Sequence, residues 1–191
     1  MKKQLKCLLM GSLIFASPLI VADEVEDALK ESLELYNEGN FKELNETLDY
    51  VRSLLSEKKG DILASKCPAE FDGLTRGEPQ ITSTSMMGGG LIVECRYSAD
   101  NREVNITYTA DSPLVSGMAM MFGNPMLNQG SKMRRFGKQK VMIKYDASRK
   151  SGEINGVAGK VMVAISASNC TEEQLMTAGK SVPYGDLSKL P

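Results

Sequence analysis

Residues 91–110 read LIVECRYSADNREVNITYTA, and this stretch decides the fold. Apolar and polar side chains alternate in both halves; the apolar positions are Leu91, Val93, Cys95, Tyr97, Val104, Ile106, Tyr108 and Ala110. The polar residues Asp100 and Asn101 separate the halves. A period of two is typical of a strand with one buried face. The stretch therefore predicts a β-hairpin with one buried face, as part of an antiparallel sheet.

Further elements follow this hairpin. The triplet Asp111-Ser112-Pro113 joins a capping residue to a proline at the first helical position, which predicts a helix over 114–122. Two more strands are indicated by Val141, Ile143 and Tyr145 and by Val161, Val163 and Ile165. Between them, residues 148–152 and Asn155-Gly156 predict turns. Thr171 opens a final short helix, because Gln174 completes a capping box.

The segment before the sheet is helical. Residues 24–38 carry apolar side chains at helical spacing, and Gly39 stands where a helix commonly ends. Asn40 then opens a second helix, which must end before Pro68 because the residue preceding a proline avoids helical geometry. Gly60 is a candidate for an earlier break. These signals predict an antiparallel helical hairpin.

The order of elements predicts an α+β fold. An N-terminal antiparallel helical hairpin is followed by an antiparallel β-sheet with helices packed on one side, because each β-hairpin has one apolar face to cover. We expect three parts: a signal peptide over 1–22, the helical hairpin over 23–66 and an α+β sandwich domain over 67–191.

The first residues predict export. Lys2 and Lys3 precede an apolar stretch over 8–15, and the small residue Ala22 follows. The stretch is too short to span a bilayer, so it is typical of a signal peptide cleaved near Ala22. An uncleaved anchor is the alternative. We expect a periplasmic protein with no transmembrane segment in its mature form.

The composition excludes several kinds of chemistry. The chain has no histidine, which removes Ser-His-Asp and Cys-His nucleophile systems and the commonest zinc ligand. Cys67, Cys95 and Cys170 follow the signal segment, and they predict either one disulfide with a free thiol or three buried thiols. Cys95 aligns with Leu91 and Val93, which favours the core over a ligand role. We expect no enzyme, no cofactor and no metal.

Charge is distributed unevenly along a chain whose net charge is −1. Residues 23–50 hold ten acidic residues and two lysines, whereas residues 132–150 hold eight basic residues and one aspartate. The predicted anionic-surface residues are Arg134, Arg135, Lys138 and Lys140. They suit an acidic envelope protein or peripheral contact with an anionic membrane surface; without interleaved aromatics they do not suggest nucleic acid. Alternatively, the acidic hairpin lies against the basic strands within one molecule.

Methionines supply a second candidate surface, formed by Met86, Met87, Met118, Met121 and Met126. Their flexible thioethers suit an adaptable contact for a partner or an apolar ligand, or simply core packing. Thioether sulfur also binds Cu(I) without histidine. The leading function is a non-enzymatic binding or accessory protein of the envelope, and the alternative is a Cu(I)-binding periplasmic protein. A hydrolase using carboxylates such as Asp111 and Asp146 is a third class.

Two resemblances accompany these patterns. Residues 36–43, YNEGNFKE, resemble the turn of a tetratricopeptide-type helix pair, but one unit cannot form the concave surface of stacked repeats. The order of elements, with Asp111-Ser112-Pro113-Leu114, residues 137–145 and the capped C-terminal helix, resembles the PsbP-like sandwiches of exported bacterial proteins. That resemblance implies binding or accessory roles without catalysis.

Overall fold

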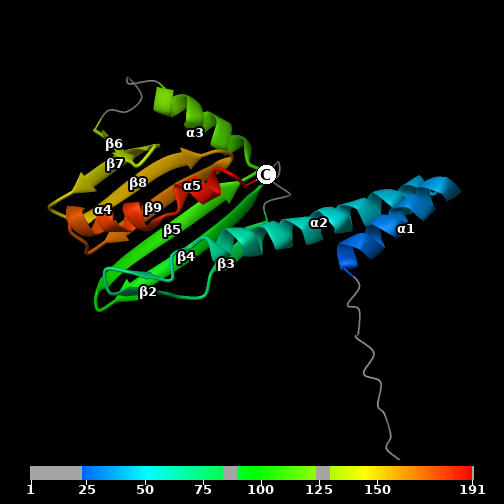
Figure 1. Ribbon diagram of the computed structural model, residues 1–191, viewed down its shortest axis with the longest axis horizontal. Coiled ribbons are helices and arrows are strands. Elements are labelled where there is room, and N and C mark those ends of the chain that lie inside the picture. The colour runs from blue at the N-terminus through cyan, green and yellow to red at the C-terminus, as the bar shows by residue number, and fades with distance from the viewer. Residues whose placement is uncertain (1–22, 84–89, 124–129, 191) are drawn as a thin grey trace, which may run out of the picture.

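The computed structural model describes residues 23–83, 90–123 and 130–190. Helices α1 (Glu24–Glu38) and α2 (Phe41–Ser65) form an antiparallel hairpin that projects away from a β-sheet (Figure 1). The Asp23 side chain accepts a hydrogen bond from the Val25 N–H at the start of α1. Gly39, in the left-handed conformation, ends this helix. The predicted helical hairpin and its glycine cap are confirmed.

Within the described residues, the sheet has nine antiparallel strands. They are β1 (Glu70–Phe71), β2 (Leu74–Arg76), β3 (Gln80–Ser83), β4 (Leu91–Ala99), β5 (Arg102–Ala110), β6 (Lys132–Phe136), β7 (Gln139–Asp146), β8 (Ser151–Ala158) and β9 (Val161–Ser168). Their order is β1-β2-β4-β5-β9-β8-β7-β6, and β3 pairs with β4 on the same side as β2. The α+β class and the β-hairpin of residues 91–110 are confirmed. The sheet therefore ends at β6 on the side away from α2, which contacts β3 and β4.

After the β4–β5 hairpin, the described part of the chain has three more helices. Helix α3 (Pro113–Gly123) contacts β8 and β9, and α4 (Glu172–Ser181) and α5 (Tyr184–Leu187) lie across the sheet (Figure 1). Both hydrogen bonds of the capping box predicted at Thr171 and Gln174 are present. The core lies between the sheet and α4 and α5, where Leu175 and Leu187 are fully buried.

The end of α2 is anchored to the sheet. A disulfide joins Cys67, just beyond the helix, to Cys95 in β4. The Arg76 guanidinium donates to the Cys67 carbonyl at 2.8 Å, and the Tyr108 hydroxyl donates to the Lys66 carbonyl at 3.2 Å. The Lys66 carbonyl stands at the C-cap of α2 and has no partner within the helix, so the Tyr108 hydroxyl satisfies it. Together, the disulfide and these hydrogen bonds hold the projecting hairpin on the core.

Cys170 is the free cysteine among the residues that the structure describes, so a disulfide with a leftover thiol replaces the alternative of three buried thiols. Its side chain is fully buried, and its Sγ lies 3.3 Å from the Ser168 carbonyl oxygen. Burial raises the pKa of the Cys170 thiol. A protonated, buried thiol of this kind is unreactive.

The expected break at Gly60 is wrong, because α2 continues through this residue to Ser65. A Cβ atom added at Gly60 would lie 2.5 Å from Cγ2 of Ile81 in β3. The glycine therefore permits close packing of the helix against the sheet instead of ending the helix.

The turn expected over 148–152 is present up to Lys150, but Gly152 already belongs to β8; the turn expected at Asn155-Gly156 is wrong, because both residues lie within β8. A Cβ atom at Gly152 would lie 2.6 Å from Leu175 in α4, and one at Gly156 would lie 3.1 Å from Val141. The two glycines therefore admit neighbouring side chains to the covered face. The sequence analysis also missed β6, because its KMRRF sequence lacks an apolar alternation.

Candidate functional site

The predicted basic residues gather on the β6–β7 hairpin, at the edge of the sheet. Arg135 and Lys140 lie directly opposite each other, and Arg134 lies opposite Val141. Lys138 stands in the two-residue turn, after Gly137 in the left-handed conformation. We call the group Arg134, Arg135, Lys138 and Lys140 the basic edge. Like charges on directly opposed residues repel, so Arg135 and Lys140 do not stabilise this hairpin.

All four side chains of the basic edge are exposed. Within the described part of the chain, none of them takes part in an ion pair. The neighbouring Lys132 reaches Glu172 at 3.9 Å. The four cations lie along one edge of the sheet, with the neighbouring strand residues Arg134 and Arg135 on opposite faces of β6.

The acidic hairpin lies at the other end of the molecule. Strand order places β6 at the edge of the sheet remote from β3 and β4, which α2 contacts (Figure 1). The described ion pairs of α1 and its N-cap residue lie within the helical hairpin. Lys30 pairs with Glu26 at 2.8 Å, and Asp23 pairs with Lys58 of α2 at 2.7 Å. The interpretation in which the acidic hairpin covers the basic strands of the same molecule is therefore wrong.

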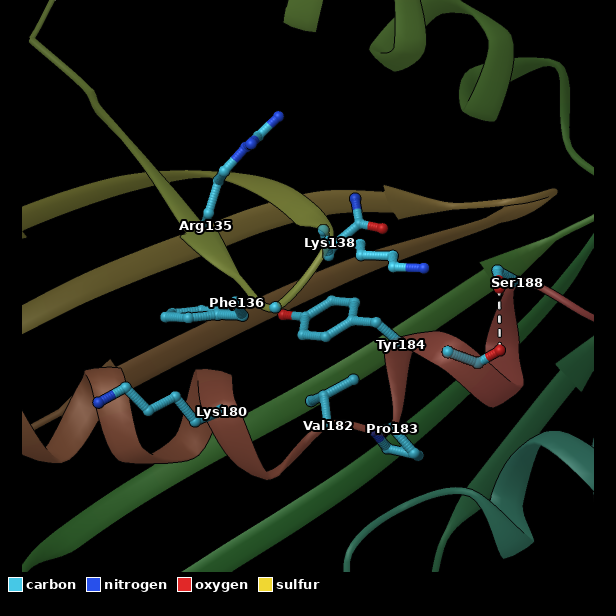
Figure 2. Close-up of a pocket in the computed structure, with 11 residues that line it drawn as sticks. Arg135, Phe136, Lys138, Lys180, Val182, Pro183, Tyr184 and Ser188 are labelled. Carbon is cyan, nitrogen blue, oxygen red and sulfur yellow. Dashed lines mark hydrogen bonds between the residues drawn. The ribbon is translucent and has the colours of Figure 1, made fainter.

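An open pocket of about 660 Å³ lies beside the basic edge (Figure 2). Arg135, Phe136 and Lys138 line it from the β6–β7 hairpin, and Lys180 lines it from the last turn of α4. Tyr184 of α5 completes the wall. Figure 2 shows the Tyr184 and Phe136 rings side by side, with Lys138 extending toward Ser188, Arg135 pointing away from the two rings and Lys180 extending away from Tyr184.

Close packing positions Lys180 and Tyr184. A Cβ atom at Gly179 would lie 2.5 Å from the Phe136 ring, so the glycine lets α4 approach β6 and brings Lys180 to the pocket. The rings of Phe136 and Tyr184 have centroids 6.3 Å apart. The structure thus joins residues about 45 positions apart in the chain, which explains why sequence reasoning missed Lys180 and Tyr184.

The Tyr184 side chain is only 7% exposed, and its hydroxyl has no hydrogen-bond partner in the described part of the chain. Burial raises the pKa of this phenol, so the group stays protonated at neutral pH. Buried hydroxyl groups nearly always find a partner, because an unsatisfied one is destabilising. Tyr184 therefore offers an unused hydrogen-bond donor at the wall of the pocket.

The predicted methionine surface is described only in part. Met86, Met87 and Met126 lie outside the described residues, and the side chain of Met121 does as well. Met118 is half-buried in α3. The neighbouring Met120 is 73% exposed, which the sequence analysis did not anticipate. The methionine surface and the copper alternative stay predictions.

The two candidate carboxylates, Asp111 and Asp146, have partners within the protein. Asp111 pairs with Lys59 at 2.7 Å. Asp146 accepts hydrogen bonds from the hydroxyl and the N–H of Ser148, which help to hold the pKa of this carboxyl below its usual range. In the part of the chain that the structure covers, no cluster of three or more Cys, Asp and Glu side chains is placed to bind a metal ion.

The acidic hairpin carries an exposed apolar stripe that the sequence analysis did not predict as a surface. Leu29, Leu33 and Tyr36 follow helical spacing along α1, and Leu33 and Tyr36 are 62% and 60% exposed. Phe41 of α2 extends the stripe, with its ring centroid 6.4 Å from that of Tyr36. Contiguous exposed apolar residues are typical of protein contact surfaces.

Across residues 23–83, 90–123 and 130–190, no helix is long and apolar enough to cross a membrane. The signal segment expected over 1–22 lies outside these ranges. Comparisons of the chain with protein-family models, curated proteins and solved structures found no match. The functional assignment therefore depends on the geometry of the basic edge and its pocket.

Proposed function

We propose that this chain is a non-enzymatic binding or accessory protein of the cell envelope, exported to the periplasm, where its basic edge docks on an anionic surface. One observation carries the proposal: the four cations Arg134, Arg135, Lys138 and Lys140 are exposed and lack ion-pair partners among the described residues. Because the acidic hairpin lies at the far end of the sheet, the basic edge can face a surface while the hairpin points away.

The free energy expected from four exposed cations supports reversible docking. A cation close to an anionic membrane contributes about 1 kcal/mol, so four of them contribute on the order of 4 kcal/mol in total. This would enrich the protein on the surface by roughly a thousandfold. Such an interaction weakens strongly with salt, because exposed charges are screened beyond about 8–10 Å at physiological ionic strength.

Other surfaces support a binding role. Met120 of α3 is exposed, and a flexible thioether adapts to varied apolar contacts, so the proposal retains the methionine-bearing helix as a place for a partner or an apolar ligand. The apolar stripe along α1 is compatible with a protein partner at the opposite end. A protein with separate surfaces of this kind suits an accessory role better than a catalytic one.

The test is co-sedimentation with phosphatidylglycerol-containing vesicles, compared with phosphatidylcholine vesicles, in low and high salt. The variant Arg134→Gln/Arg135→Gln/Lys138→Gln should weaken binding on the order of a hundredfold, because three cations are lost. Exposed substitutions of this kind change stability by at most about 0.5 kcal/mol, so the melting temperature should hardly move.

A matched control removes three exposed lysines away from the basic edge, Lys42, Lys160 and Lys189, by substitution with Gln. It should bind like the unmodified protein, because net charge changes equally but the basic edge is intact. Equal losses in the two triple variants would show a general charge effect and contradict the proposal. Absence of salt-sensitive binding by the unmodified protein would also contradict it.

A further inference from the structure

The pocket beside the basic edge has an unusual set of side chains. Arg135, Lys138 and Lys180 bring three cations to it, and none of the described residues that line it is acidic. A guanidinium and two ammonium groups without a carboxylate form a surface of hydrogen-bond donors. A multiply charged anion supplies the acceptors that this set lacks.

Tyr184 extends this set of donors inward. Its ring is buried between Phe136 and the region of Gly156, where an added Cβ atom would lie 3.7 Å from the tyrosine Cε1. In Figure 2 its hydroxyl points toward Phe136 and the β6–β7 turn, both of which form the pocket wall. Among the residues that the structure describes, the hydroxyl has no acceptor. An acceptor on a bound molecule would satisfy it.

Part of the remaining wall is apolar, although Gln139 and Ser188 also line the pocket. Phe136, Val182 and Pro183 line the pocket between the charged residues. The pocket volume of about 660 Å³ greatly exceeds that of a bare inorganic anion and lies in the range of sites for small organic molecules. An anionic group attached to a carbon body therefore fits this arrangement better than a simple ion.

We propose that this pocket binds a phosphate ester, with Lys138, Lys180 and the Tyr184 hydroxyl contacting the phosphate and with Phe136 and Val182 contacting the carbon body. Arg135 and Lys138 link the pocket to the basic edge, because each of them belongs to both. This inference deepens the proposed function by naming a ligand class for the same region, and it rests on that function only for the biological role of the ligand. A phosphate ester is available either as a lipid headgroup or as a soluble metabolite.

Titration with glycerol 3-phosphate, followed by calorimetry or by NMR shifts, tests the pocket without a membrane. The Tyr184→Phe variant removes one oxygen atom. It should weaken binding by about tenfold or more if the hydroxyl donates to the charged ligand. The same variant should not lower the melting temperature, since it removes an unsatisfied buried group. A tyrosine with a purely structural role would leave binding unchanged.

Two further variants locate the ligand. Lys180→Gln should weaken binding severalfold, whereas Lys144→Gln, with the same charge change on an exposed residue outside the pocket lining, should not. Gly185→Glu should block binding, because Gly185 lines the pocket, an added Cβ atom there meets open space, and the carboxylate repels the phosphate.

The vesicle experiment and the glycerol 3-phosphate titration distinguish this inference from the proposed function. If glycerol 3-phosphate binds and its binding depends on Tyr184, the pocket is supported even when no vesicle is bound. If phosphatidylglycerol vesicles bind and their binding also requires Tyr184, the lipid headgroup is the source of the phosphate ester. Vesicle binding that depends only on the basic edge, with no glycerol 3-phosphate binding, would overturn the pocket and keep the proposed function. Inorganic phosphate binding as tightly as glycerol 3-phosphate would overturn the role of the apolar wall.

Discussion

The disulfide between Cys67 and Cys95 should contribute a large share of the stability. It joins the chain just beyond α2 to the middle of β4, where Cys95 lies opposite Ile106, and both half-cystines are buried, with exposed fractions of 4% and 0%. Reduction is a cleaner perturbation than substitution, because both sulfur atoms stay in the core. The effect of reduction then reports the covalent link and not a cavity.

The sequence separation sets the expected magnitude. The bond closes a loop with a separation of 28 residues. Chain entropy alone predicts that such a link stabilises the folded state by about 3.5 kcal/mol. For a domain of this size, each kcal/mol shifts the melting temperature by about 2–4 °C, so reduction should lower it by about 7–14 °C.

The assay is thermal unfolding with and without reductant, together with thiol labelling of the chain that begins near residue 23. Unfolded but unreduced protein should label at Cys170 alone, and reduced protein should label at all three cysteines. The Cys67→Ala/Cys95→Ala variant is the control, because its melting temperature should not respond to reductant. Labelling of three thiols without reductant, or a shift in melting temperature below about 2 °C, would refute the reasoning.

Three other predictions follow. Edman sequencing of the protein from its native envelope should find a start near Asp23, and an intact Met1 on membrane-bound protein would contradict export with cleavage. The Met118→Leu/Met121→Leu variant should change the free energy of unfolding by less than about 1.5 kcal/mol. Anaerobic titration of the unmodified protein should find no tight Cu(I) binding. A sub-nanomolar affinity that this double variant abolishes would favour the copper alternative. Gly179→Ala should destabilise the fold by about 1–3 kcal/mol in urea unfolding, because a Cβ atom there would lie 2.5 Å from the Phe136 ring. Gly185→Ala, where an added Cβ atom meets nothing, should be close to neutral in the same assay, and equal effects would show that crowding is not the cause.

Local patterns predicted most of the elements. The alternation over residues 91–110, the glycine after α1 and the capping box at Thr171 each describe interactions within a few residues, and all are confirmed. Glycine was the main source of error. Gly60, Gly152 and Gly156 resemble breaks and turns in the sequence, but each one makes room for a side chain distant in the chain. Sequence periodicity carries no information about such contacts.

The sequence by itself determined that the chain forms an α+β fold with an N-terminal helical hairpin, and that four cations gather near residues 134–140. Only the tertiary structure decided that Cys67 pairs with Cys95 and that the acidic and basic ends lie apart. It also decided that Lys180 and Tyr184 line the pocket beside the basic edge. The physical reason is the range of the interactions. Capping and alternation act between near neighbours, whereas a disulfide, a sheet order and a pocket wall depend on packing between segments remote in sequence.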